Sequence, residues 1–350
     1  MKKQGSGLDI DLGNHCSKIA FQWAKKTFAN RKDRAGSPCL DIEGSFSNIM
    51  NFGGIRLGMS SDGIGTKIEL AERTGIYDTL GYDLVAMVAD DLVTSGIEPV
   101  NLSNILDVDF LDADIVDALM SGLHDACNYA GITITGGEIA ELGNRIGGYG
   151  DKMHFNWCAT GIGLLPDNVT PIDGTKIEHG DAIISLRSRG FRSNGFSLLR
   201  KIMQSEFGDQ WHEVPYDADT TWGRILLTPS LIYTPVIMRL MQKGRNIRGI
   251  VHITGGGIED NFMRILDATG CGAVLDKLHP PLDVMKRAQE LGNVTDEQAY
   301  RLWNMGNGML IVLPEKDCQD VIEQVKNAGY HAIVAGHITK ASGIILKMDE

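Results

Sequence analysis

Glycine-rich loops that follow predicted strands constrain the fold of this chain more than any other feature. Such loops occur at residues 61–67, 136–141 and 254–257, each before a polar or helical segment. At a strand-to-helix turn the backbone N–H groups point outward and can hold a phosphate. No loop contains the Gly-Lys-Ser/Thr triplet of a Walker A motif, and none is a good dinucleotide fingerprint. The chain is therefore predicted to be α/β, without the loops of a generic kinase or dehydrogenase.

Hydrophobic spacing supports this fold class on both sides of one candidate boundary. The spacing predicts a helix over 80–95, a second helix that begins at Asp112 and ends near Gly131, and strands over 54–60 and 99–106. Residues 165–171 contain two prolines, and strand and helix patterns begin again beyond them. The later elements are predicted as strands at 182–186, 249–253, 308–313 and 331–335, with helices at 224–242 and 315–328. We expect two mixed α/β domains, 1–168 and 169–350, after a polar, turn-rich start over residues 1–52.

Charge and composition exclude several classes of partner. The 350 residues carry a formal net charge of −12, which repels nucleic acid and anionic membranes. No apolar run reaches the ~20 residues of a membrane helix, and the first residues contain no apolar leader segment. The six cysteines are scattered without a Cys-x-x-Cys pair, so we expect reduced thiols rather than a zinc site or disulfides. These features predict a cytoplasmic protein that acts on a small molecule.

The first glycine-rich loop is the most informative candidate site. An Asp62 carboxylate could ligate Mg²⁺, which prefers hard oxygen donors, and the Lys67 ammonium could neutralise a phosphate. The alternative is a plain strand-to-helix turn in which Asp62 only caps the backbone. The residues expected to bind the nucleotide are Asp62, Gly63, Gly65, Thr66, Lys67, Gly136 and Gly137.

Two further acidic positions complete the predicted metal site. Asp91 follows Asp90 in the predicted helix, and Glu138 follows two glycines. A nucleotide-bound Mg²⁺ takes only one or two protein carboxylates, so Asp62, Asp91 and Glu138 would be sufficient if the fold brings them together. The alternative for Asp90 and Asp91 is a solvated helix face. The predicted catalytic set is Asp62, Lys67, Asp91 and Glu138.

The second half contains candidate substrate-binding loops. An arginine, a hydroxyl and an amide occur together at a predicted helix start, although an ordinary helix cap with an exposed arginine is the favoured interpretation of this loop taken alone. Three successive glycines at 255–257 suggest that something approaches the backbone closely. The expected substrate-binding residues are Arg192, Ser193, Asn194, Gly195, Thr254, Gly255, Gly256 and Gly257. His154 and His252 lie in apolar strands, where core histidines with satisfied hydrogen bonds are the usual outcome.

In their order along the chain these motifs resemble the phosphoribosylformylglycinamidine cyclo-ligase (AIR synthetase) family. The resemblance begins at residues 7–14 and continues through 62–67, 81–87 and 136–141. In the second half it covers residues 193–195, 226–229, 252–257 and 304–306, so that it spans nearly the whole chain.

The resemblance implies a two-domain fold in which two N-terminal sheets pair in a homodimer and form a barrel. It also implies that ATP and Mg²⁺ bind mainly to the first domain and that glycine-rich backbone holds a ribose phosphate. In that family ATP activates the formyl amide oxygen of formylglycinamidine ribonucleotide, and the amidine nitrogen then closes the imidazole ring as phosphate leaves. Positioning and charge stabilisation dominate such chemistry, in which no covalent nucleophile is needed.

Several departures from the family pattern leave other functions open. Arg192 replaces the usual histidine, Asn104 replaces an aspartate, and residues 43–48 and 142–145 differ from the family's loops. One alternative is another ATP-using enzyme of the superfamily, such as a relative of thiamine-monophosphate kinase, acting on a different acid or amide. Another is a non-catalytic nucleotide-binding protein that has kept the scaffold.

Overall fold

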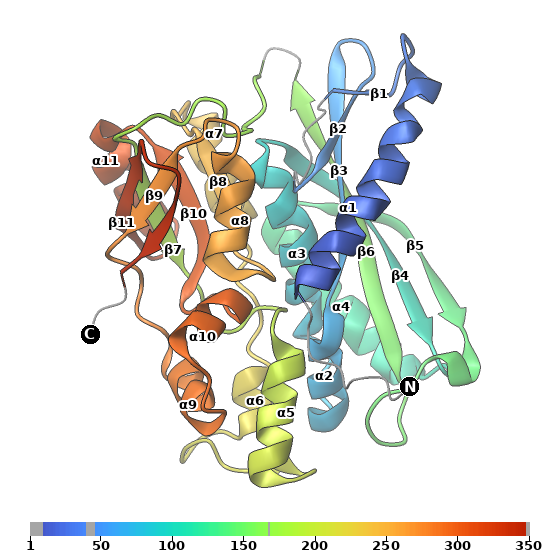
Figure 1. Ribbon diagram of the computed structural model, residues 1–350. Helices are drawn as coiled ribbons and strands as arrows, with labels where there is room; N and C mark the ends of the chain where they lie inside the picture. The colour runs from blue at the N-terminus through green and yellow to red at the C-terminus, as the bar shows by residue number, and fades with distance from the viewer. Residues whose placement is uncertain (1–9, 40–45, 167–168, 348–350) are drawn as a thin grey trace.

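A computed structural model describes residues 10–39, 46–166 and 169–347 of the protein. Two six-stranded sheets lie side by side, one in each half of the chain (Figure 1). The first residues of the 7–14 motif and of the 43–48 loop, and residues 167–168 of the candidate boundary, lie outside the described residues.

The first sheet has the strand order β1-β2-β3-β6-β4-β5. All neighbouring strands are antiparallel except β4 and β5, which run parallel. The C-terminal ends of β3, β4 and β5 therefore meet at one end of the sheet, beside the start of β6. The strands span Ser37–Pro38 (β1), Asn48–Asn51 (β2), Ile55–Gly63 (β3), Glu98–Val108 (β4), Thr133–Glu141 (β5) and Phe155–Pro166 (β6).

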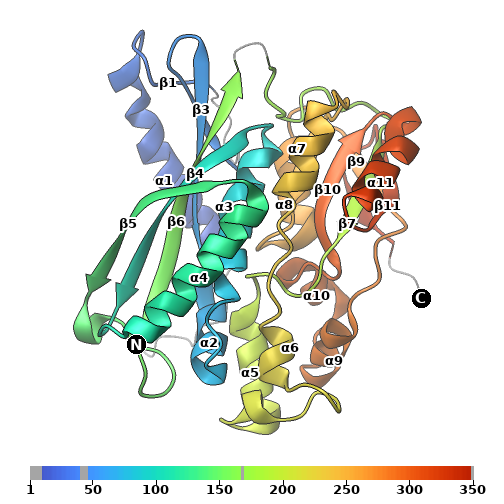
Figure 2. The same cartoon turned by 180° about the vertical axis from the view of Figure 1, so that it is seen from behind.

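Two helices cover one face of this sheet, and much of the other face, called the open face below, is exposed. Helices α3 (Leu80–Thr94) and α4 (Ala113–Ala130) lie against the sheet, and the Asp112 carboxylate caps α4 by accepting from the N–H groups of Asp114 and Ile115. Figure 2 shows α4 in front of the sheet, whereas α1 (Ile10–Lys26) lies on its other side. Along β4 the side chains alternate between the two faces, so that Leu106 is buried while Ile105 is 50% exposed.

The second sheet has the order β12-β9-β11-β7-β10-β8 and is covered on both faces. Its central strands β7 (Ala182–Arg187) and β10 (Asn307–Leu313) are almost entirely buried, because α7 and α11 pack on one face and α8 on the other. The remaining elements span Thr234–Gln242 (α7), Gly249–His252 (β8), Gly257–Leu266 (α8), Gly272–Leu275 (β9), Cys318–Asn327 (α11), Ala332–Thr339 (β11) and Gly343–Leu346 (β12).

A shared core joins helices from both halves below the sheets (Figure 1). It includes the buried tryptophans Trp157, Trp211, Trp222 and Trp303, which come from both halves of the chain. Because one apolar cluster crosses between the halves, their relative position is fixed by packing as well as by polar contacts. These helices span Ile68–Thr74 (α2), Phe196–Phe207 (α5), Trp222–Leu226 (α6), Asp283–Leu291 (α9) and Asp296–Leu302 (α10).

The predicted fold class, a mixed α/β chain with two sheets, is confirmed. Two local predictions are wrong. The single helix over 224–242 is two helices, because Pro229 and Pro235 interrupt the backbone hydrogen bonds between α6 and α7. The turn-rich start contains α1, an amphipathic helix whose apolar side chains Leu12, Ile19 and Trp23 are exposed rather than packed on a core. The dimer barrel and the boundary between residues 168 and 169 stay predictions. Within the described residues, no helix combines the length and apolarity that crossing a membrane requires.

Candidate active site between the two halves

The loop after β3 lies where the two halves of the chain meet. The Asp62 carboxylate accepts a hydrogen bond from the Gly63 N–H at 2.7 Å. Gly65 has a φ of 68°, a left-handed conformation that favours glycine, and leads into the short 3₁₀ helix Gly65–Lys67. Thr66 is exposed, and its hydroxyl lies 3.3 Å from the hydroxyl of Ser197 in α5. The first half of the site is therefore directly opposite the start of α5.

Lys67 does not point toward this opening. Its side chain is 0% exposed, and its Nζ lies 2.8 Å and 2.7 Å from the two carboxylate oxygens of Asp83. The same ammonium donates to the carbonyl of Thr228 at 2.8 Å. The prediction that Lys67 contacts a phosphate is therefore wrong. Lys67 lies one residue before α2 and points inward, where it neutralises the buried Asp83 of α3.

Asp62 and Asp91 form a pair of closely spaced acidic groups on the helix-covered side of the sheet. Burial raises the pKa of Asp62 to about 6; the Gly63 N–H lowers that pKa, and the charge of Asp91 raises it. Burial raises the pKa of Asp91 to about 7, against the lowering influence of Arg264, Ser60 and Arg192. Two carboxylates that repel each other in a half-buried position gain stability from a bound cation.

Arg192 is also directed inward. Its guanidinium is 1% exposed and donates to Asp90 at 3.0 Å, to the carbonyl of Leu231 at 3.0 Å and to His252 Nε2 at 2.6 Å. The prediction that Arg192 binds substrate is thus corrected, since its donors are directed at protein acceptors. Asp90 is 0% exposed and also accepts from the N–H groups of Tyr233 and Thr234, so the alternative of a solvated helix face is wrong.

The predicted loops of the second half lie next to each other. A Cβ on Gly255 would lie 3.6 Å from Asn194 Oδ1, and Gly195 packs so closely on Trp303 that a Cβ would lie 2.3 Å from the ring. Gly255 is exposed at the start of α8. Gly257 is instead required by internal packing, because a Cβ there would meet the carbonyl of Tyr300 at 1.8 Å. The three glycines are therefore only partly explained by an approaching ligand.

The Ser193–Gly195 loop approaches the first half of the site. A Cβ on Gly65 would lie 3.9 Å from the carbonyl oxygen of Ser193. The Ser193 hydroxyl is buried without a hydrogen-bond partner among the described residues, and the Asn194 amide lies 3.9 Å from Met87 Sδ in α3. Thr254 donates from its hydroxyl to Asn261 at 3.3 Å. Ser193, Asn194, Gly255 and the loop at 62–66 are thus the predicted residues that the fold brings together.

Glu138 lies apart from the other predicted metal ligands. Paired residues of neighbouring strands share a face of the sheet, and successive residues alternate between faces. Asp62 pairs with Ala159, which pairs with Asn104 on the helix-covered face. Glu138 pairs with Ile105 and so lies on the open face. Within one subunit, the predicted set of Asp62, Asp91 and Glu138 is corrected to a pair.

Gly136 and Gly137 belong to β5, in the middle of a strand and away from any helix start. They pair with Ser103 and Asn104 of β4, and a Cβ on Gly137 would lie 2.7 Å from the carbonyl oxygen of Asn104. The expected phosphate-binding loop is thus an edge strand whose glycine permits close packing on its neighbour. In agreement with the separation of Glu138, the described residues contain no group of three or more His, Cys, Asp or Glu side chains that could hold a metal.

The sequence did not indicate that His252 and Arg264 act on the Asp91 carboxylate. His252 Nδ1 lies 2.7 Å from Asp91 Oδ1, and the charge of Arg264 also acts on Asp91. The expectation that His252 is a core histidine with satisfied hydrogen bonds is correct, but its partners could not be read from the sequence. They come from α3 and from the loop before α5, more than 50 residues away along the chain.

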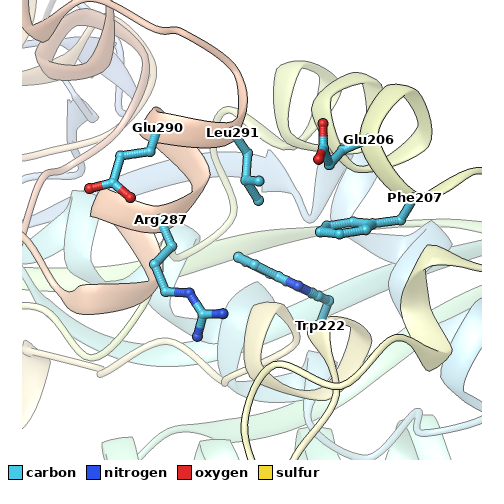
Figure 3. Close-up of a pocket in the computed structure, with 6 residues that line it drawn as sticks. All are labelled: Glu206, Phe207, Trp222, Arg287, Glu290 and Leu291. Carbon is cyan, nitrogen blue, oxygen red and sulfur yellow. The ribbon is translucent and has the colours of Figure 1, made fainter.

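A separate cavity of about 370 Å³ lies between α5, α6 and α9 (Figure 3). Figure 3 shows the Trp222 and Phe207 rings at its base, with charged side chains of α5 and α9 around them. The lining residues are Glu206, Phe207, Trp222, Arg287, Glu290 and Leu291. None of them belongs to the predicted site.

Comparison with known families identifies both halves of the chain. Residues 47–163 match the family described as AIR synthase related protein, N-terminal domain, and residues 178–349 match AIR synthase related protein, C-terminal domain. The chain belongs to the AIR synthase related family. This AIR synthase related chain is 32% identical over 339 residues to the phosphoribosylformylglycinamidine cyclo-ligase of Thermococcus kodakarensis, covering 97% of this chain and 96% of the relative. It is 35% identical over 344 residues to the cyclo-ligase of Carboxydothermus hydrogenoformans, covering 96% and 95%.

Solved structures of the AIR synthase related fold agree with the architecture. Thiamine-monophosphate kinase from Stenotrophomonas maltophilia has a TM-score of 0.64 at 15% identity, covering 92% of this chain and 95% of that chain. A hydrogenase maturation protein HypE in complex with ATP has a TM-score of 0.59 at 19% identity, covering 83% and 81%. At these identities the similarity establishes the fold of this AIR synthase related chain.

Proposed function

We propose that this protein is a phosphoribosylformylglycinamidine cyclo-ligase, which uses Mg·ATP to close the imidazole ring of 5-aminoimidazole ribonucleotide in purine biosynthesis. The observation that carries the proposal is full-length similarity, at 32% and 35% identity, to proteins of that name. The partly buried pair Asp62 and Asp91, opposite the glycine-containing loops of the second half, supports it.

Asp62 and Asp91 fit a magnesium ion by their chemistry. Both are hard oxygen donors, and each is held in a position where its own charge is unfavourable without a cation. Bound there, Mg·ATP would supply the phosphoryl group that converts the formyl oxygen of the substrate into a leaving group. A site with only two protein carboxylates is suited to a nucleotide-bound ion, because phosphate oxygens and water complete its coordination.

The remaining residues of the site have positioning roles in this proposal. Thr66 and the backbone of Gly63 and Gly65 would hold the nucleotide phosphates from the first half, where Thr66 and Gly65 are exposed. Ser193, Asn194 and Gly255 would hold the ribose phosphate of the substrate from the second half. Closing the ring needs the amidine nitrogen held against the formyl carbon, which bound substrate geometry supplies without a protein nucleophile.

We infer that the protein is a homodimer formed through the open face of the first sheet. Exposed apolar side chains gather there, among them Met59, Ile105 and Ile162 at 37%, 50% and 37% exposure. A contiguous patch of exposed apolar side chains is uncommon on a monomer. Glu138 lies on the same face, so a role for it would arise only in the dimer. The expected location of the protein is the cytoplasm.

A coupled assay tests the proposed function. Purified protein is incubated with Mg·ATP and formylglycinamidine ribonucleotide, and both ADP and the aminoimidazole product are measured. Equal amounts of the two products are expected from the wild type, and none from Asp62→Asn. ADP formed only with thiamine monophosphate or with another acid or amide would identify a different enzyme of the superfamily. ATP binding without turnover of any of these substrates would identify a non-catalytic nucleotide-binding protein.

A further inference from the structure

A continuous chain of hydrogen bonds runs across the boundary between the halves and ends on Asp91. Arg192 Nη2 lies 3.0 Å from Asp90 Oδ2 and 2.6 Å from His252 Nε2. His252 Nδ1 lies 2.7 Å from Asp91 Oδ1. The two aspartates are neighbours in α3, whereas the arginine and the histidine come from the second half.

The donors in this chain determine where the proton of His252 resides. A guanidinium has only donors, so the bond between Arg192 and His252 requires Nε2 to be the acceptor. A neutral imidazole then carries its proton on Nδ1 and donates it to the Asp91 carboxylate. Arg192 therefore selects the tautomer that orients Asp91.

The backbone of Arg192 indicates that its position is tightly held. Its φ is 60°, a left-handed conformation that costs a non-glycine residue on the order of 1 kcal/mol or more. The conformation is maintained by the contacts of the guanidinium with Asp90 and Leu231 and by its packing 5.0 Å from the centre of the Tyr233 ring. A strained and buried arginine with these partners is well placed to hold His252 in one orientation.

We propose that Arg192 and His252 are positioning residues that hold the Asp91 carboxylate in the orientation needed for metal binding. His252 occupies Asp91 Oδ1, which leaves Oδ2, 3.4 Å from the Ser60 hydroxyl, to face the site of the cation. Bonds of this kind behind a metal ligand fix its direction, and their loss typically lowers metal affinity 10–100-fold. The metal-binding part of this inference rests on the proposed function, whereas the tautomer of His252 does not.

The tautomer is tested directly in the metal-free protein by ¹⁵N NMR of histidine-labelled samples. His252 is assigned by the loss of its signals in His252→Phe. The inference predicts a neutral ring with the proton on Nδ1 and an unprotonated Nε2. A proton on Nε2, or a ring protonated on both nitrogens, would mean that Arg192 does not donate to it and would overturn the inference.

The positioning role is tested by metal titration of His252→Phe, which keeps the pair of Arg192 and Asp90. The concentration of Mg²⁺ for half-maximal turnover is expected to rise roughly 10- to 100-fold, with kcat at saturating Mg²⁺ little changed. His154→Phe is the matched control, because His154 Nδ1 also lies 2.7 Å from a carboxylate, Asp109 Oδ2, but contacts no residue of the site. Its metal requirement should equal that of the wild type.

Two further results distinguish failure of the positioning role from failure of the cyclo-ligase proposal. An unchanged Mg²⁺ requirement in a folded His252→Phe variant would contradict the positioning role even if the enzyme is active. If the wild type has no turnover, Mn²⁺ binding in the presence of a non-hydrolysable ATP analogue, followed by electron paramagnetic resonance, replaces the kinetic titration. Weaker Mn²⁺ binding in His252→Phe would then support the positioning role although the cyclo-ligase proposal had failed, and equal binding would overturn it.

Discussion

Lys67 and Asp83 form a fully buried ion pair, with Nζ 2.8 Å from Oδ1 and 2.7 Å from Oδ2. The pair also links the two halves of the chain. The ammonium donates to the carbonyl of Thr228, and Asp83 accepts from both the N–H and the hydroxyl of Ser230. A lysine in a glycine-rich loop is therefore used for the packing of the halves.

The variant Lys67→Met is expected to lower the free energy of unfolding by about 3–5 kcal/mol, because it leaves the Asp83 carboxylate buried without a counter-charge. The double variant Lys67→Met/Asp83→Leu should recover part of this loss, since it removes both charges. Urea unfolding measures each variant. Wild-type stability in Lys67→Met combined with a higher KM for ATP would instead support a phosphate contact.

The pKa of Asp62 predicts how one substitution changes stability with pH. Burial raises that pKa from 3.8 to about 6, with Asp91 raising it and the Gly63 N–H lowering it. Between these two values the native state holds a proton that the unfolded chain has lost, so the contribution of Asp62 to stability falls as pH rises through this window. Asp62→Asn should therefore be at least as stable as the wild type at pH 7.5, and its advantage should shrink toward pH 4. Free energies of unfolding across this range check it; a variant less stable at pH 7.5 would contradict the raised pKa.

Two neighbouring glycines provide a matched comparison at the start of α8. Ala at position 257 is expected to lower the free energy of unfolding by more than about 2 kcal/mol, because φ is 65° and the new Cβ would overlap the carbonyl of Tyr300. Ala at position 255 has space, 3.6 Å from Asn194 Oδ1, and should change stability by less than about 0.5 kcal/mol. Thermal unfolding of Gly257→Ala and Gly255→Ala measures both. Equal stability of the two variants would show that the packing on Tyr300 is not tight.

The open face of the first sheet predicts the behaviour of two surface substitutions. Ile105→Asp places a charge in the centre of the proposed dimer interface, and sedimentation should show a monomer. Ile345→Asp, on β12 at the edge of the other sheet, replaces an isoleucine that is 57% exposed and should leave the dimer intact. Sedimentation of the wild type as a monomer would contradict the proposed dimer interface.

The elements with strong periodic signals were predictable from the sequence. Helix α4 was located from Asp112 to Gly131, because a side-chain cap, regular apolar spacing and a C-terminal glycine all agree. Helix α1 was missed although Leu12, Ile19 and Trp23 recur at helical spacing. These side chains are 56%, 43% and 65% exposed, so among the described residues the stripe packs on no core.

The site was predictable only where chemistry and local geometry coincide. Asp62 lies at the end of a strand, as its loop indicated. Lys67 and Arg192 were assigned to ligands because a cation in a glycine-rich loop suggests an anion, but their anions are Asp83 and Asp90 of α3. Glu138 was misplaced because the face of an edge strand depends on its register with β4, including the irregularity between Leu102 and Ser103. Such partners depend on tertiary packing, which residue spacing does not encode.

The central claim is that ATP activates the formyl oxygen of the substrate. Following that oxygen atom into the released phosphate tests this claim most directly. Formylglycinamidine ribonucleotide labelled with ¹⁸O at the formyl oxygen is incubated with the protein and Mg·ATP, and the released phosphate is examined by mass spectrometry. If ATP activates the formyl oxygen, one ¹⁸O atom appears in each phosphate formed with the aminoimidazole product. Phosphate without the label, released while the product forms, would contradict activation of that oxygen.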